Sequence, residues 1–489
     1  MAETDRAGPS EQLAEVEEKP YRDRTSAFCE IRKRELGLSQ STDFSRRAGG
    51  SEALIKRMTQ YGKLYGHKGC VNTVCFNFNG DVLVSGSDDK DIIFWDWPMK
   101  SKMFSYNSGH IENVFQARIM PFSDDRTVIS SGADGQVRVG EIKEDGEANT
   151  KQIGSHRGRV HKIAIEPGSP HAFYSCGEDG LVQHFDLRSP IPNKLFICSS
   201  TSGNRRLPLN GIVIDPRNPN LFSIGGIDEY ARLYDIRKHH QTDLLTDQPV
   251  DIFCPNHLIK SAGIHITGLS YSNTSELLVS YNDELIYLFT KDMGIGPDLK
   301  SVSQDDSVKT KQPQPQVYVG HRNAQTIKGP SFFGLKDEYV VSGSDCGHVY
   351  IWRKKGGELI SMMHGDKQVV NCIEAHPYFP FLATSGFDKS IKLWTPTASR
   401  TTPFPKNAVE VREANKSGRE ARAQTALGPD IIMHVLRLQR RQAVAYIERS
   451  PTVASDIGSD GEEDREAIVV RFSNDEDGED GDPRECSIT

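Results

Sequence analysis

A frame of about forty residues recurs along this chain, and it constrains the fold more than any other feature. In residues 66–97, "GHKGCVNTVCFNFNGDVLVSGSDDKDIIFWDW", a Gly-His pair precedes three alternating runs, with an Asp in a turn and a Trp-Asp pair at the end. Positions equivalent to Asp96 follow at steps of 45, 45, 49, 55, 63 and 42 residues, at Glu141, Asp186, Asp235, Thr290, Arg353 and Thr395. The chain therefore contains seven repeats, with the shortest steps typical of propeller blades.

Seven such repeats predict an all-β fold. A four-stranded blade cannot bury both of its faces alone, so blades stack radially and leave only short edges. We expect a seven-bladed β-propeller over residues 55–397, in which the first strand of the chain, near residues 63–65, completes the last blade. The longer steps are explained by loop insertions at 189–209, 238–263 and 291–317.

The frame resembles the WD repeat, and this resemblance implies a structural role for its polar residues. A turn carboxylate accepts a hydrogen bond from a histidine, and buried polar groups must be paired. The residues expected in this internal network are His67, Asp89, Trp95, Asp179, Asp228, Asp388 and Trp394. A catalytic His-Asp-Ser triad is not favoured, because the set recurs around the ring. Four blades depart from the frame and are expected to be held mainly by packing: the second, with Gly140 in place of the aromatic, the fourth and fifth, without Gly-His, and the sixth, with Cys346 at the turn-Asp place.

Two repeats share a further pattern. The stretches "FYSCGEDGLVQHFDLR" at 173–188 and "FSIGGIDEYARLYDIR" at 222–237 have a Gly, an Asp, an aromatic-Asp pair and a final Arg at the same offsets. Because residues two apart in a strand share a side, Asp186 with Arg188, like Asp235 with Arg237, should leave one strand end together. We expect the two arginines to form a two-point anchor for a partner. The alternative is that each Arg pairs with an Asp of its own or the neighbouring blade.

The aromatic-Asp-x-Arg box resembles the box of WD-repeat substrate receptors of cullin-4 RING ubiquitin ligases. "GHKGCVNTVCFN", "VVSGSDCGHVYIW" and "LATSGFDKSIKLWTPTA" extend the resemblance to the eighth-member type of the adaptor-and-cullin-4-associated factors, including its plant form. It implies that the boxes contact the damaged-DNA-binding adaptor and that the chain is a non-enzymatic subunit presenting a protein for ubiquitination. The first and last repeats end in "WDWP" and "WTPT", without the Arg. The alternative is a nuclear WD-repeat scaffold, such as a histone-binding or complex-assembly platform.

The segments outside the ring have a different character. We expect residues 1–20 to be disordered and 21–60 to form a helical extension with helices at 25–37 and 51–62. Residues 398–450 are expected to form a linker followed by an amphipathic helix at 429–448. Residues 451–489 carry thirteen Asp and Glu against three Arg, which predicts a disordered acidic tail.

Composition limits the remaining functions. The formal net charge of −8 is concentrated in the acidic tail, so the sequence predicts no direct nucleic-acid binding. No run approaches 18 apolar residues, so we expect no membrane span and a location in the nucleus and also the cytoplasm, with Arg32, Lys33 and Arg34 as a nuclear-import candidate. Nine cysteines without a CxxC pair indicate reduced thiols, and "CPNH" at 254–257 reads as a loop, so no metal or other cofactor is expected.

Overall fold

The computed structural model describes residues 27–38, 40, 49–200, 205–238, 248–261, 263–297 and 313–425. The expected disorder of residues 1–20, the helix expected at 429–448 and the acidic tail at 451–489 lie outside the described residues. Among the described helices, none is long and apolar enough to cross a membrane.

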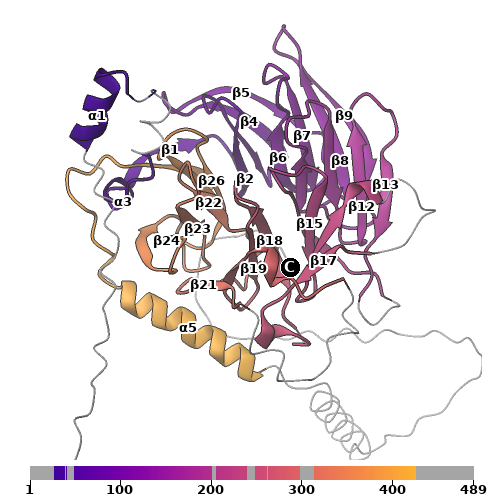
Figure 1. Cartoon of the computed structure of the whole chain (residues 1–489). Helices are drawn as coiled ribbons and strands as arrows, with labels where there is room; N and C mark the ends of the chain where they lie inside the picture. The colour runs from indigo at the N-terminus through magenta and orange to yellow at the C-terminus, as the bar shows by residue number, and fades with distance from the viewer. Residues whose placement is uncertain are drawn as a thin grey trace, which may run out of the picture.

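Seven four-stranded antiparallel sheets stand around a central axis and confirm the seven-bladed β-propeller (Figure 1). Each sheet is one blade, numbered here in chain order from the innermost strand outward. Blade 1 consists of β2 (Val71–Phe76), β3 (Leu83–Ser87), β4 (Asp91–Asp96) and β5 (Ser101–Asn107). Blade 2 consists of β6 (Val114–Ile119), β7 (Thr127–Gly132), β8 (Gln136–Ile142) and β9 (Ala148–Ser155). Blade 3 consists of β10 (Lys162–Ile165), β11 (Ala172–Cys176), β12 (Leu181–Asp186) and β13 (Asn193–Ile197).

Blades 4 to 7 follow the same order. Blade 4 consists of β14 (Leu209–Ile214), β15 (Leu221–Gly226), β16 (Ala231–Asp235) and β17 (Asp251–Phe253), and blade 5 of β18 (Ile266–Tyr271), β19 (Leu277–Tyr281), β20 (Ile286–Phe289) and β21 (Gln316–Tyr318). Blade 6 consists of β22 (Ser331–Phe333), β23 (Tyr339–Ser342), β24 (His348–Arg353) and β25 (Leu359–His364). Blade 7 consists of β26 (Val370–Ala375), β27 (Leu382–Gly386), β28 (Ser390–Thr395) and β1 (Thr59–Tyr65).

The two ends of the propeller sequence meet in blade 7. Strand β1 pairs antiparallel with β28, with Leu64 opposite Ile391 and Tyr65 opposite Ser390. This confirms that the first strand of the chain completes the last blade. Pairing the two ends of the sequence in one sheet closes the ring through backbone hydrogen bonds, so that the last blade is held by both of them.

Hydrophobic side chains between neighbouring blades form the core. Between blades 1 and 7, for example, Val71, Val74 and Trp95 pack against Phe381 and Leu393, and all five are buried. The alternation seen in the sequence places these side chains on one face of each sheet, where they meet the next blade.

The helices lie outside the ring (Figure 1). They are α1 (Ala27–Glu35), α3 (Glu52–Ile55) and α5 (Ala408–Thr425), with 3-10 turns η1 (Ile236–Lys238), η2 (Asn256–Leu258) and η3 (Lys291–Met293). The expected helix at 51–62 is wrong beyond its first turn. Ile55 and Met58 are buried against blades 6 and 7, and the chain enters β1 at Thr59 because it pairs there with β28. Strand pairing therefore overrides the helical spacing of the sequence.

Helix α5 occupies part of the segment expected to be a linker. It lies along the outside of the ring beside β21 and β24 (Figure 1). Ala408 is buried there, and the Asn415 amide nitrogen donates to the Gly320 carbonyl oxygen at 2.9 Å and to the Tyr350 hydroxyl at 3.2 Å. The helix was not predicted, because most of its side chains are polar and only a narrow stripe contacts the propeller.

Candidate partner-binding rim of the propeller

The two Asp-x-Arg boxes lie at equivalent places in neighbouring blades. Asp186 is the last residue of β12 in blade 3, and Asp235 is the last residue of β16 in blade 4. Arg188 follows in a turn and Arg237 follows in η1. We call the side on which third strands lead into fourth strands the box rim. Because successive blades repeat one topology, both arginines emerge on this rim.

The Arg188 guanidinium is fixed by the carboxylate two residues before it. Its Nε donates to Asp186 Oδ1 at 2.9 Å and its Nη2 donates to Oδ2 at 2.7 Å, while its backbone N–H donates to Oδ1 at 3.0 Å. The hydrogen bond from the Arg188 side chain, followed by that from its backbone, holds the pKa of Asp186 well below its usual range. The arginine side chain nevertheless stays 72% exposed, so it is oriented without being covered.

Arg237 repeats this geometry in blade 4. Its Nε donates to Asp235 Oδ1 at 2.9 Å, its Nη2 to Oδ2 at 2.6 Å, and its backbone N–H to Oδ1 at 3.0 Å. Its side chain is 64% exposed. Each Arg thus pairs with an Asp of its own blade, as the alternative interpretation expected, and each also faces solvent. An exposed ion pair contributes little to stability, so the pairing alone does not explain why two blades carry the same box.

The internal network of blade 1 contains the histidine, aspartate and tryptophan expected in it. His67 Nδ1 lies 3.0 Å from Asp89 Oδ2, and His67 Nε2 lies 2.7 Å from Ser85 Oγ. Trp95 Nε1 donates to the same hydroxyl at 2.8 Å. Burial acts to raise the pKa of Asp89, but hydrogen bonds from His67 and from two backbone amides outweigh it and lower the pKa to about 2. These contacts join the loop before the blade to its second and third strands.

Blades 2 and 3 repeat the histidine network. His156 Nδ1 lies 3.0 Å from Asp179 Oδ1 and His156 Nε2 lies 2.7 Å from Ser175 Oγ. In blade 2, His110 makes the same contacts with Asp134 at 2.9 Å and with a serine hydroxyl at 3.0 Å. In three consecutive blades a serine hydroxyl is thus hydrogen-bonded to a histidine, which fits a structural role better than nucleophilic catalysis.

Asp228 and Asp388 are also partly buried turn residues, but their partners are cations instead of histidines. Arg232 Nη2 donates to Asp228 Oδ2 at 2.5 Å, and Lys392 Nζ donates to Asp388 Oδ2 at 2.8 Å. In blade 4 an ion pair thus adds to the hydrophobic packing that the sequence predicts. In blade 7, Trp394 Nε1 donates to a threonine hydroxyl at 2.9 Å, as Trp95 does to a serine.

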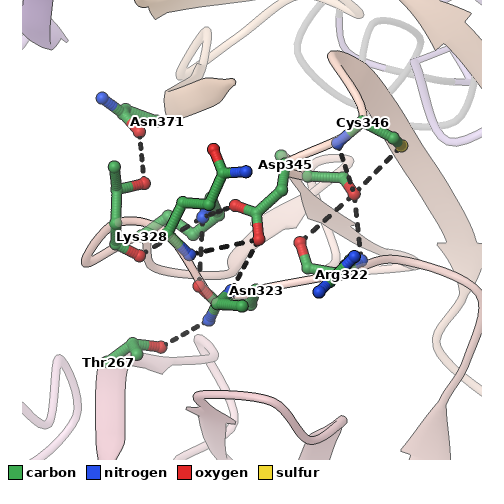
Figure 2. Close-up of polar contacts among 12 residues, drawn as sticks. Thr267, Arg322, Asn323, Lys328, Asp345, Cys346 and Asn371 are labelled. Atoms are coloured by element: carbon green, nitrogen blue, oxygen red, sulfur yellow. Dashed lines mark hydrogen bonds and ion pairs between the residues drawn. The ribbon is translucent and has the colours of Figure 1, made fainter. Parts of the chain in front are cut away.

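Blade 6 uses a lysine from a different part of the blade. Figure 2 shows Lys328 between Asp345 and Asn323. Its Nζ donates to Asp345 Oδ1 at 2.5 Å and to Asn323 Oδ1 at 3.1 Å, and both ionic side chains are almost completely buried. The Asn323 amide nitrogen in turn donates to Thr267 Oγ1 of blade 5 at 2.7 Å. With Cys346 at the expected turn-Asp place, the carboxylate one residue earlier thus takes the role.

Sequence reasoning missed these cations, although two of them left a signal. Arg232 and Lys392 each follow a turn Asp by four residues and precede the aromatic residue by two, inside an otherwise apolar strand. A charged residue at such a buried position requires a partner. Lys328 left no such signal, because its stretch follows neither the helical nor the strand period.

The described residues contain no group of three or more His, Cys, Asp and Glu side chains placed to hold a metal ion. In the "CPNH" stretch, Cys254 is buried, whereas His257 Nε2 lies 3.0 Å from the Tyr287 hydroxyl. This histidine therefore contacts the neighbouring strand of blade 5.

Helix α1 presents apolar side chains to solvent. Phe28, Ile31, Leu36 and Leu38, within the helix and directly after it, are 71%, 46%, 63% and 74% exposed. Figure 1 shows the helix at the periphery of the propeller. An exposed apolar cluster of this kind is typical of a surface that meets another protein.

The comparisons with known proteins agree with this architecture. The family model of the WD domain, G-beta repeat, matches residues 58–96 and 357–395, which run from β1 to the end of β4 and through the strands from β25 to β28. The chain is thus a WD-repeat propeller.

Similar proteins are found in mammals and in a plant. DDB1- and CUL4-associated factor 6 from Mus musculus is 32% identical over 286 residues, which cover 57% of this chain and 32% of that protein. Protein ALTERED SEED GERMINATION 2 from Arabidopsis thaliana is 32% identical over 50% of this chain and 37% of that protein. The human WD and tetratricopeptide repeats protein 1 is 22% identical over 74% of this chain. The chain is homologous to DDB1- and CUL4-associated factor 6 and spans about a third of its length.

Proposed function

We propose that this chain is a non-catalytic substrate receptor of a cullin-4 RING ubiquitin ligase and that Arg188 and Arg237 bind the damaged-DNA-binding adaptor. One observation carries the proposal. Two guanidinium groups in the same conformation stand on adjacent blades, and each is oriented by its own Asp while most of its side chain is exposed.

The chemistry of the boxes suits such a contact. The bonds to Asp186 and Asp235 use Nε and Nη2, and within the described residues Nη1 of each arginine makes no hydrogen bond. A guanidinium held in place loses little conformational entropy on binding, so its remaining N–H groups can bind a partner's carboxylate or carbonyl oxygens at low cost. Arginine is also enriched among the residues that dominate interface energies.

The homologues support the same class of function. The mouse and human relatives are named for their association with DDB1 and CUL4. We extend this to the present chain and place it with the eighth-member type of these factors. We further propose that loops of the ring select the protein to be ubiquitinated and that the protein acts in the nucleus, with a cytoplasmic pool.

Replacing both box arginines tests the proposal. Arg188→Ala with Arg237→Ala should weaken binding of the purified adaptor on the order of a thousandfold, because each truncation removes a contact of the hot-spot class. The affinity is measured by biolayer interferometry, and thermal unfolding of the same sample reports on the fold. The melting temperature should stay within about a degree of the wild type, because exposed ion pairs contribute little.

A matched control comes from blade 2. Lys143 stands two residues after Glu141, at the place of the box arginine, and Arg126 lies nearby; both are about half exposed and paired with glutamates. Arg126→Ala with Lys143→Ala therefore removes the same charge from the same rim and should leave adaptor affinity unchanged. If the box variant binds the adaptor as the wild type does, the anchor is refuted, and a nuclear scaffold becomes the better interpretation.

Helix α1 offers a second contact in the same complex. We propose that its apolar residues Phe28 and Ile31 bind the adaptor at a second point, away from the boxes, because their side chains are exposed. Phe28→Asp with Ile31→Asp should then weaken adaptor binding in the wild type and abolish what remains in the arginine variant. Unchanged binding in both backgrounds would exclude the helix from the interface.

A further inference from the structure

We propose that the axial channel of the propeller binds a small oxyanion between Lys162 and Arg118. This site is separate from the box rim and does not depend on the function proposed above. The innermost strands of all seven blades line a cavity of about 360 Å³ on the ring axis. Its charged lining residues are Arg118 on β6, Lys162 on β10 and Glu374 on β26, two cations against one carboxylate.

The two channel cations, Arg118 and Lys162, lack the close carboxylate partners that the buried lysines Lys328 and Lys392 have. Within the described residues, Lys162 makes no hydrogen bond or ion pair through its ammonium group. Arg118 Nη1 donates a hydrogen bond to Cys75 Sγ at 3.8 Å, but the nearest carboxylate oxygen in an ion pair with it, Glu374 Oε1, lies 4.0 Å away, beyond hydrogen-bond distance. By contrast, the ammonium groups of Lys328 and Lys392 lie 2.5 Å and 2.6 Å from a carboxylate oxygen.

The surroundings make an uncompensated positive charge costly. Burial lowers the pKa of Lys162, and burial raises the pKa of Glu374. Both shifts mean that the channel disfavours charges that are not closely paired. An anion placed between the ammonium and the guanidinium would pair both cations, and it would make charge-assisted hydrogen bonds that are stronger than those between neutral groups.

The lining indicates the class of ligand. A guanidinium binds two oxygens of one carboxylate or phosphate side by side, and an ammonium adds a point charge to a third oxygen. The side chains of Arg118 and Glu374 are 35% and 23% exposed, so a small molecule can reach them from within the channel. Phosphate and a small polycarboxylate both have this chemistry and fit the volume. Glu374 opposes such a ligand electrostatically and so limits its affinity.

The opposite roles of lysine and glutamate provide the test. Inorganic phosphate and, separately, citrate are titrated into the full chain by calorimetry at constant ionic strength set with sodium chloride. We expect one saturable site for at least one of them. Lys162→Met should weaken it about tenfold or more, whereas Glu374→Gln, which keeps the side-chain size, should strengthen it several-fold. The better of the two anions then identifies the oxyanion class.

The controls keep the proposal falsifiable. Lys102→Met removes an exposed lysine from the outer strand of blade 1 and should not change anion binding. Lys162→Met should fold, because it removes a charge without a close partner; should it not, Glu374→Gln alone decides. No saturable binding by either anion in the wild type, equal loss in Lys102→Met, or no strengthening in Glu374→Gln would each overturn the site.

Discussion

Blades 1 to 3 and blades 4, 6 and 7 stabilise the same kind of turn carboxylate with different partners. In blades 1 to 3, histidines His67, His110 and His156 bind the turn Asp and a strand serine. In blades 4, 6 and 7 the partners are Arg232, Lys328 and Lys392, and the contacts are ion pairs in which the cation is buried. One half of the ring therefore uses a polar network and the other half uses full charges.

This difference shows how a repeat can lose its sequence signature and keep its shape. Both solutions fix the turn to the interior of the blade, and in both the buried carboxylate has a close donor. They differ in what happens when one partner is removed. In both halves the turn carboxylate keeps backbone N–H donors, as Asp134 and Asp345 do. Removing a histidine takes away one hydrogen bond, whereas removing the lysine or arginine of a buried ion pair also takes away the positive charge that balances the carboxylate.

The largest effect is expected in blade 6. Lys328→Met should lower the free energy of unfolding by about 3–5 kcal/mol, because Asp345 stays buried without its cation. Adding Asp345→Asn should recover most of the loss, since the amide oxygen can still accept from the backbone N–H groups of Ala324 and Gln325. Urea unfolding followed by circular dichroism measures both variants. A double variant as unstable as the single one would show that the charge is not the cause.

A smaller effect is expected from the matching change in blade 2. His110→Leu should cost about 1–3 kcal/mol, the range for removing one partner of a buried hydrogen bond. Asp134 keeps the backbone N–H groups of Ile111 and Gln136, both at 3.0 Å, so its charge stays partly compensated. The same urea experiment compares this loss of unfolding free energy with that of Lys328→Met. A loss equal to that of Lys328→Met would break the distinction between them.

The histidine half should also show its contribution in the pH dependence. The pKa of Asp89 is lowered to about 2 in the folded protein, below the usual value near 4 of an unfolded chain. Its contribution is therefore complete above about pH 4 and is lost as the pH falls towards 2. Asp89→Asn should cost about 2 kcal/mol at pH 7 and progressively less below pH 4, as measured by urea unfolding across this range. A cost that does not change with pH would assign the effect to shape instead of charge.

The repeat frame allowed the propeller, the ring closure and the position of both boxes to be predicted, because these follow from strand spacing. The partners of Asp228, Asp345 and Asp388 did not follow, because the frame specifies the carboxylate and leaves the donor open. Lys328 approaches Asp345 only once the blade has folded. The exposure of Arg188 beside its own Asp likewise depends on the turn in which it lies.

The positions of the helices also depend on tertiary contacts that the sequence pattern does not specify. The spacing of Leu54, Ile55 and Met58 predicts a helix that continues to Gly62, but from Thr59 onward the chain pairs with β28 as a strand. Helix α5 has a weak apolar period and is positioned by its contacts with blade 6. There Asn415 reaches the Gly-His stretch through the Gly320 carbonyl oxygen, at the blade whose histidine lacks an aspartate partner.

That histidine gives the smallest effect at neutral pH and the sharpest comparison. His321 occupies the same Gly-His place as His110, but it is fully buried and neither ring nitrogen has a hydrogen-bond partner among the described residues. Burial first, and then the positive charges of Arg419 and Lys328, lower its pKa to about 3. His321→Leu should therefore cost almost nothing at pH 7.5, because no hydrogen bond is lost.

The acid range then separates the two histidines. The unfolded chain takes up a proton at the imidazole below about pH 6.5, whereas folded His321 does not until about pH 3, so the wild type loses stability as the pH falls. His321→Leu removes this loss and should be more stable than the wild type by about 2 kcal/mol at pH 5. Urea unfolding at pH 7.5 and pH 5, with His110→Leu as the matched variant, measures the difference. A destabilisation of His321→Leu at pH 7.5 as large as that of His110→Leu would mean that His321 does have a polar partner in the folded ring. Blade 6 would then use a histidine as blades 1 to 3 do, and the contrast between the two groups of blades would no longer include it.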